Sequence, residues 1–186
     1  KIEIAVIGAG AAGYFAAIAA ASKGAKVHIF EKTTKTLTKV KVSGGGRCNV
    51  THDCESPAQL VKYYPRGGRR LKKAFSAFGP KETRAWFESR GLALKTESDG
   101  RVFPKSDSSQ SIIDCLESEA NALGITLHKS MELLNVSSEQ DSEVLLEFKN
   151  EKLYACQSLI IASGGSPQIR AYQFLKNLGL QLHDPI

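Results

Sequence analysis

The sequence predicts an α/β fold built on a parallel β-sheet, and three observations support this prediction. An apolar run at residues 2–7 leads through a glycine-rich turn into an alanine-rich stretch, which is the order strand, turn, helix. Residues 25–30 follow Gly24, are rich in apolar and β-branched residues, and are typical of a neighbouring strand. Residues 159–162 are fully apolar and precede a glycine pair, a pattern typical of a strand buried in a parallel sheet.

The composition is that of a folded domain. Of the 186 residues, 42% are hydrophobic and 24% are charged, which excludes a disordered or collagen-like chain. No uninterrupted apolar run reaches the roughly 20 residues of a membrane span, and no basic segment precedes the first strand. We therefore expect a soluble, cytoplasmic protein without a membrane partner. Because the chain opens on Lys1 without a methionine, we also expect it to be a fragment of a longer protein.

Charge and cysteine content narrow the class of ligand. The formal net charge of +6 favours small anions such as phosphates, but it is too diffuse to indicate nucleic acid, and we expect no nucleic-acid partner. The four cysteines form no Cys-x-x-Cys pair, so we expect reduced thiols.

The glycine-rich turn predicts a dinucleotide site. Gly8 permits the tight turn, Gly10 lets the backbone approach a pyrophosphate, and Gly13 allows the helix to pack closely on the strand. The helix directs its first N–H groups and a partial positive charge toward the phosphates. Glu31 lies 18 residues after Gly13, at the end of the second strand. Its carboxylate is placed to accept both hydroxyls of an adenosine ribose and to repel a 2′-phosphate, which disfavours NADP.

A second glycine-rich loop, residues 43–49, reads Ser-Gly-Gly-Gly-Arg-Cys-Asn. Three consecutive glycines leave backbone N–H groups open to an anion or to a flat ring. We therefore expect this loop to touch the cofactor.

Together these motifs resemble the FAD-dependent oxidoreductases that carry the same seven-residue loop, which include aminoacetone-oxidase-like and bile-acid-reductase-like flavoproteins. The similarity extends to Gly-Arg-Val-Phe-Pro at residues 100–104 and to Ile-Ala-Ser-Gly-Gly at residues 161–165. It implies a Rossmann-like FAD-binding domain of the two-dinucleotide-binding type, with a parallel sheet and a β-meander crossover. It further implies that residues 1–186 are an incomplete FAD/NAD(P)-binding domain with an insertion at residues 32–124, lacking the C-terminal substrate domain and the closing FAD segment.

The resemblance also implies which residues contact the cofactor. The backbone of Leu133 is expected to contact the adenine, and Arg47 is expected to stabilise the pyrophosphate or the reduced flavin. No catalytic residue and no metal ligand is predicted. The expected FAD-binding residues are Gly8, Gly10, Ala11, Ala12, Gly13, Glu31, Lys32, Lys39, Ser43, Gly44, Gly45, Gly46, Arg47, Cys48, Asn49, Leu133, Ala162, Ser163 and Gly164.

The remaining segments predict further elements. Residues 81–90 form an amphipathic helix with Trp86 in the core, and Asp99-Gly100 is the turn of a hairpin. Residues 108–123 have helical spacing, and residues 125–128 form a third strand of the sheet. A meander of three strands, separate from the strand at 159–162, is predicted at residues 131–136, 143–148 and 152–156.

Residues 63–78 are basic and aromatic. We interpret them first as a solvated helix face, and second as a contact for an anionic substrate or a second nucleotide. Nucleic acid is the least favoured interpretation, because no RNA-binding aromatic motif accompanies the charges.

The leading hypothesis is an FAD-dependent oxidoreductase that acts on a small molecule, with NAD(P)H or oxygen as redox partner. An NAD-dependent dehydrogenase, which leaves the loop at 43–49 unexplained, and a non-catalytic dinucleotide-binding protein are the alternatives. Cys48 and Cys54 enclose five residues where flavin-dependent disulfide reductases have four, which disfavours a dithiol relay. A zinc site at Cys48, His52 and Cys54 is disfavoured because no fourth ligand pair follows.

Overall fold

The computed structural model describes residues 2–54, 56–138 and 143–183, and the chain divides into two compact units. The first unit contains Lys1–Thr38 and Leu116–Ile186, and the second contains Lys39–Cys115. In the sequence the second unit lies between two strands that are neighbours in the sheet of the first.

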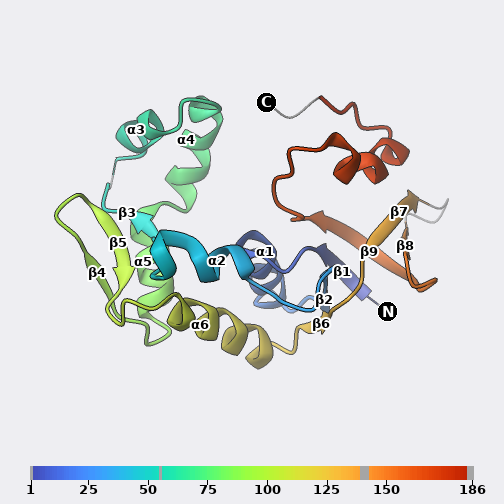
Figure 1. The fold of residues 1–186 in the computed structure, drawn as a ribbon, viewed down its shortest axis with the longest axis horizontal. Coiled ribbons are helices and arrows are strands. Elements are labelled where there is room, and N and C mark those ends of the chain that lie inside the picture. Colours follow the sequence, from blue (N-terminus) through green and yellow to red (C-terminus); the bar gives the residue numbers. More distant parts are fainter. Residues whose placement is uncertain (1, 55, 139–142, 184–186) are drawn as a thin grey trace. The chain divides into compact units, whose positions relative to one another are not determined.

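The first unit is built on a six-stranded mixed sheet with the order β6-β2-β1-β9-β8-β7 (Figure 1). The strands β6, β2, β1 and β9 run parallel to one another, whereas β8 pairs antiparallel with both β9 and β7. The α/β fold with a mainly parallel sheet is therefore confirmed. The strands are β1 (Ile2–Ile7), β2 (Val27–Phe30), β6 (Thr126–His128), β7 (Leu133–Ser138), β8 (Val144–Phe148) and β9 (Leu153–Ile161).

The predicted separation of the third meander strand from the last parallel strand is wrong. One continuous strand, β9, pairs antiparallel with β8 through Leu153–Cys156 and parallel with β1 through Cys156–Ile161. Cys156, the residue at which the two pairings meet, is fully buried. Because the polar linker residues Gln157 and Ser158 are compatible with an extended backbone, the strand continues where the sequence suggested an interruption.

Helix α1 (Ala11–Ala21) connects β1 to β2, and its buried residues include Tyr14, Ala17 and Ile18. Alanine and other small side chains let the helix lie close to the neighbouring strands. After the helix, Gly24 adopts a φ of 91°, the left-handed conformation that commonly ends helices. The strand, helix and strand predicted from the first 30 residues are confirmed.

Aromatic side chains form the centre of the core over β2 and the meander. Phe30 lies between Phe148, at a ring-centroid distance of 4.8 Å, and His128, at 4.6 Å. His128 Nε2 is also 2.9 Å from Nδ1 of His28, and both imidazoles are half-buried. Burial lowers the pKa of each histidine, since it disfavours the charged imidazolium.

The second unit combines helices with a three-stranded antiparallel sheet in the order β3-β5-β4. The turn at Asp99-Gly100 joins β4 to β5, with Gly100 at a φ of 83°, so the predicted hairpin is confirmed. The helices and strands between the two segments of the first unit are α2 (Thr38–Val42), the 3₁₀ helix η1 (Ser43–Gly46), β3 (Thr51–His52), α3 (Pro57–Leu60), η2 (Val61–Tyr63), α4 (Gly68–Ala77), α5 (Pro80–Glu88), β4 (Leu94–Thr96) and β5 (Arg101–Pro104). Helix α6 (Ser109–Ala122) begins in the second unit and continues into the first, which also contains the 3₁₀ helix η3 (Ile169–Leu178).

The predicted place of Trp86 in the core is wrong. Its neighbour Phe87 is buried at 2% exposure, whereas Trp86 is half-buried under the guanidinium of Arg90, 4.0 Å from its ring. A helix of nine residues turns only one side fully inward, and here Phe87 occupies that side.

Within the part of the chain that the structure describes, no helix has the length and apolar character needed to cross a membrane.

Candidate functional site

The glycine-rich turn between β1 and α1 has the close packing that its spacing predicted. Gly8 has a φ of 107°, and a side chain there would overlap the carbonyl oxygen of Ala162 at the end of β9. A side chain on Gly13 would overlap the carbonyl oxygen of Gly8. In contrast, a Cβ on Gly10 would meet nothing within 4 Å. The turn is therefore packed against β9 but open above Gly10.

The start of α1 exposes backbone N–H groups that no side chain caps. Gly10 is the N-cap residue, no side chain hydrogen-bonds this end, and no acidic residue lies in the first turn. Tyr14 N–H donates to Gly10 O at 3.0 Å, so the regular helical ladder begins there and the preceding N–H groups have no partner within the helix. Ala11 and Ala12 are exposed at this end. These N–H groups, with the helix dipole, are suited to an anion.

Glu31 lies against the turn. Its Oε2 accepts a hydrogen bond from Ala9 N–H at 2.9 Å. Its Oε1 accepts from the N–H and from the hydroxyl of Thr33, each at 2.9 Å. Oε2 thus retains an unused lone pair, and the carboxylate is fixed next to the open face of the glycine turn.

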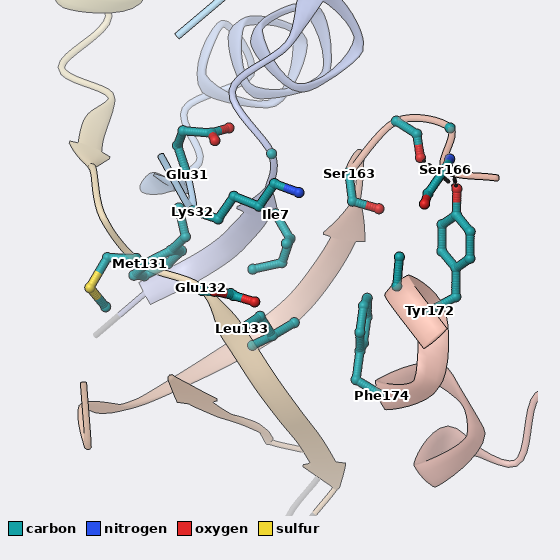
Figure 2. A pocket seen from close by; sticks show the side chains of 15 residues that line it. Ile7, Glu31, Lys32, Met131, Glu132, Leu133, Ser163, Ser166, Tyr172 and Phe174 are labelled. Carbon is teal, nitrogen blue, oxygen red and sulfur yellow. Dashed lines mark hydrogen bonds between the residues drawn. The ribbon is translucent and has the colours of Figure 1, made fainter. Parts of the chain in front are cut away.

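A pocket of about 180 Å³ opens beside this carboxylate, wholly within the first unit (Figure 2). Glu31 and Lys32 reach it from the end of β2, and Met131 to Leu133 come from the start of β7. The loop after β9 and the helix η3 close the other side. The lining residues are Ile7, Gly8, Phe30, Glu31, Lys32, Met131, Glu132, Leu133, Ser163, Gly164, Gly165, Ser166, Ala171, Tyr172 and Phe174.

Leu133 lines this pocket at the start of β7, and its backbone polar groups are not used in the ladder with β8. Lys149 N–H donates to Glu132 O at 2.9 Å, which makes the opposed residues Leu133 and Phe148 a non-hydrogen-bonded pair of the antiparallel ladder. The N–H and C=O of Leu133 consequently point away from β8. Because β7 is an edge strand of the sheet, this donor and acceptor face no further strand.

Tyr172 is a site residue that sequence reasoning missed. Its hydroxyl donates to Gly164 O at 3.0 Å and accepts from Ser166 N–H at 2.5 Å, which fixes the loop after β9 (Figure 2). Phe174, 9% exposed, adds an apolar wall to the pocket. Both follow the predicted glycine pair by fewer than ten residues, but no spacing rule links an aromatic residue in such a helix to the pocket.

The second predicted loop lies in the second unit. Gly44, Gly45 and Gly46 all have positive φ angles, of 54°, 67° and 85°. A Cβ on Gly44 would approach Asn49 N to 2.8 Å and the Phe103 ring to 3.0 Å, whereas one on Gly45 or Gly46 would meet nothing. The three glycines thus form a left-handed turn that only glycine adopts without strain.

Arg47 is held by acidic and aromatic side chains of its own unit. Its guanidinium is 2.5 Å from Glu97, 3.4 Å from Asp107 and 4.0 Å from the centre of the Phe103 ring. The hydrogen bond to Glu97 raises the pKa of Arg47, so it stays charged. In this arrangement the guanidinium braces the glycine loop against the β4–β5 hairpin, because Glu97 and Phe103 belong to that hairpin.

The other predicted residues of this loop have mainly local contacts. Ser43 Oγ donates to Val40 O at 2.8 Å, and the Asn49 amide nitrogen donates to Thr51 O at 2.8 Å and to Val102 O at 3.2 Å. Lys39 is exposed on α2. Cys48 is buried at a φ of 62°, and burial raises the pKa of its thiol, which is the opposite of what a reactive thiolate needs.

The predicted residues therefore form two groups. Gly8, Glu31, Lys32, Leu133, Ser163 and Gly164 line one pocket, with the open end of α1 next to Gly8, while residues 43–49 form a separate structured loop. The described residues contain no group of three or more metal-ligating side chains.

This fold and turn define a Rossmann-type nucleotide-binding domain. Residues 2–185 match the HI0933-like protein Rossmann domain, so the chain belongs to this family.

Similar proteins include enzymes and a solved structure. The ribosomal RNA dihydrouridine synthase of Escherichia coli is 30% identical over 165 residues, which are 89% of this chain and 40% of that protein. The 3-dehydro-bile acid delta(4,6)-reductase of Clostridium scindens is 34% identical over 141 residues, 74% of this chain and 34% of that enzyme. The structure of Thermovibrio ammonificans THI4 has the same fold, with a TM-score of 0.67 and 13% identity over 97% of this chain and 64% of the other. The chain thus spans less than half the length of the two relatives compared by sequence.

Proposed function

We propose that this chain is the FAD-binding part of a flavin-dependent oxidoreductase that reduces a carbon–carbon double bond conjugated with a carbonyl group. The observation that carries the cofactor assignment is the fixed Glu31 carboxylate beside a glycine turn that is closed at Gly8 and Gly13 and open at Gly10. This arrangement leaves room for a ligand at the position where the family's spacing requires it.

The residues fit the ADP half of FAD. The uncapped start of α1 above Gly10 is suited to the pyrophosphate, since its N–H groups and dipole favour negative charge. The unused lone pair of Glu31 Oε2 is suited to a ribose hydroxyl. The outward N–H and C=O of Leu133 match the donor and acceptor edge of an adenine, and Phe174 offers an apolar wall.

For the second unit we propose that it is an insertion whose glycine loop contacts the flavin side of the cofactor. The exposed positions of Gly44 and Gly45 support this role. The contacts of Arg47 with Glu97 and Phe103 support a guanidinium that holds the glycine loop in place. FAD, when bound, supplies hydride transfer, while the protein supplies orientation and electrostatics.

The names of two similar enzymes support the reaction class. Dihydrouridine is uridine with its ring double bond reduced, and a delta(4,6)-reductase of a 3-dehydro bile acid reduces double bonds conjugated with the 3-oxo group. Both reactions add a hydride to one carbon and a proton to the other, with NAD(P)H as the proposed electron source. The two substrates differ greatly in size and polarity, so the shared feature is the activated double bond.

Equilibrium titration tests the cofactor assignment. We expect FAD to bind more tightly than FMN, because FMN lacks the AMP portion that Glu31 and Leu133 would hold. Binding of NADH without binding of FAD would instead establish the NAD-dependent dehydrogenase. Tight FAD binding without reduction by NADH or NADPH would favour the non-catalytic alternative.

Anaerobic mixing tests the reaction class. The FAD-loaded protein is reduced, then mixed with a uridine-containing RNA or with a 3-oxo-4,6-diene steroid, and reoxidation of the flavin is followed at its visible absorption band. Reoxidation with formation of the saturated product is the expected result. If neither unsaturated compound is consumed and the reduced flavin is reoxidised only in a separate mixing with air-saturated buffer, the result would indicate an oxidase.

A further inference from the structure

The positive charge of this chain is concentrated in one segment. Of the 25 lysines and arginines, seven lie in residues 56–81, which contain no acidic residue. The remaining 18 are outnumbered by the 19 acidic residues of the rest of the chain. The whole net charge of +6 therefore originates from the segment that carries α3, η2 and α4.

Six of these cations form what we call the α4 basic surface, and all six are exposed. Among the described residues none of the six is in an ion pair, whereas Arg47, Arg84 and Arg101 of the same unit each contact a carboxylate. No carboxylate among the described residues of the unit thus neutralises their charge. The α4 basic surface consists of Lys62, Arg66, Arg69, Arg70, Lys72 and Lys73.

The arrangement of α4 separates its cations from its apolar side chains. Leu71 and Phe75 lie one helical turn apart and are half-buried. Phe75 packs on Tyr64, at a ring-centroid distance of 5.3 Å, next to η2. The apolar side is therefore covered in part by the preceding segment, while no residue of α4 is fully buried. A helix that inserts into a lipid surface needs that apolar side free, so the arrangement favours a polyanion in solution over a membrane.

Exposed aromatic rings flank the cations. Tyr63 is 67% exposed and lies against His52, with ring centroids 5.3 Å apart. Phe78, 45% exposed, follows the other end of α4. Cationic side chains bind phosphates without regard to sequence, and exposed rings stack on unpaired bases.

We propose that the α4 basic surface binds single-stranded RNA, with its cations on the phosphates and Tyr63 and Phe78 under bases. Single-stranded RNA fits better than a duplex because only unpaired bases offer a free face to these rings. This inference departs from the expectation of no nucleic-acid partner, which treated the positive charge as diffuse, whereas its excess lies in residues 56–81. It extends the proposed function by naming a substrate class and a docking surface, but RNA binding here requires no flavin.

Salt-dependent binding of a fluorescein-labelled oligouridylate about 15 nucleotides long tests the proposal. The full chain carrying Arg69→Gln, Arg70→Gln, Lys72→Gln and Lys73→Gln is compared with a control carrying Lys23→Gln, Lys105→Gln, Lys152→Gln and Lys176→Gln, four exposed lysines outside the segment. The α4 variant should bind at least roughly tenfold more weakly at low salt, and its plot of log K against log salt should flatten by about 0.7 for every phosphate that the variant no longer binds. The control has the same reduction in formal charge and should keep most of the affinity and slope.

Further variants separate the two components of the surface. Tyr63→Ala should weaken binding roughly tenfold with little change in the salt slope, because stacking releases no counterions. Arg69→Lys with Arg70→Lys should keep the slope of the unaltered protein. Circular dichroism and FAD titration of every variant show whether the fold and the nucleotide site are intact.

The results that would overturn the proposal are an α4 variant that binds RNA as the unaltered protein does, or a control whose affinity falls as far. Equal binding of an RNA duplex, or tighter binding to phosphatidylglycerol vesicles, would also contradict it. FAD binding without RNA binding would remove this surface and leave the proposed function standing, whereas RNA binding without FAD binding would do the reverse.

Discussion

The carboxylate of Glu31 and the backbone N–H of Ala9 are joined by a 2.9 Å hydrogen bond that connects the end of β2 to the glycine turn. Ala9 is itself buried at 1% exposure, so this contact fixes backbone and acid together. A site fixed in this way loses little conformational entropy when a nucleotide binds.

Replacing this carboxylate tests its role in binding. Glu31→Gln keeps the size of the side chain but removes the charge, and hydrogen bonds to charged groups are worth about 1.5–3 kcal/mol. We expect FAD affinity to fall roughly ten- to hundredfold, as measured by fluorescence titration. Glu3→Gln is the matched control, because Glu3 also accepts a backbone N–H bond, from Lys26, but lies outside the pocket. A similar loss in both variants would mean that the effect is one of stability.

Two glycines of the same turn should respond differently to alanine. Gly13→Ala places a methyl group on the Gly8 carbonyl and should destabilise the fold by several kcal/mol, roughly the cost of overpacking. In Gly10→Ala the new methyl group meets open space, so the free energy of unfolding should change by about 1 kcal/mol or less. The affinity for FAD should nevertheless fall, because the methyl group occupies the position of the ligand. If Gly10→Ala bound FAD normally, the pyrophosphate would have to lie elsewhere.

The histidine pair predicts a pH dependence of stability. Burial lowers the pKa of both His28 and His128 below the ordinary value of 6.5. As pH falls below about 6.5, the unfolded chain takes up protons that the folded protein resists, so stability decreases toward acid. The melting temperature should therefore fall by a few degrees between about pH 7.5 and 5.5. His128→Gln should reduce that fall, and His183→Gln, at an exposed position, should not.

Thiol reactivity distinguishes a structural Cys48 from a redox-active one. None of the four cysteines is in a disulfide, and burial raises the pKa of Cys48 and of Cys156, while Cys54 is half-buried. With a disulfide reagent near pH 8, Cys48 should react roughly tenfold more slowly than Cys54. Cys48→Ala should leave the fast phase unchanged. Disappearance of the fast phase in that variant would revive a dithiol relay.

Much of the first unit could be predicted because its signals are local. The turn at Gly8 and Gly13, the strand before it and the acid after β2 all follow from spacing within about 30 residues, in agreement with the known dinucleotide-binding fingerprint. The turn at Asp99-Gly100 has an equally local cause.

The parts that could not be predicted depend on contacts between distant segments. Tyr172 reaches Gly164 and Ser166 only because η3 folds back against β7, and Met131 enters the pocket because its N–H bonds to Glu31 O. Trp86 and Phe87 are equally apolar in sequence, and only the packing of α5 decides which of them is buried.

The continuity of β9 has a consequence for attempts to shorten this domain. The first part of this strand, Leu153–Cys156, pairs with β8, and β1 pairs only from Cys156 onward. Deleting the hairpin of β7 and β8 would therefore uncover a row of unpaired peptide groups along Leu153–Cys156, a template for intermolecular strand addition. A trimmed version should fail by aggregating, even though every residue of the glycine turn is retained.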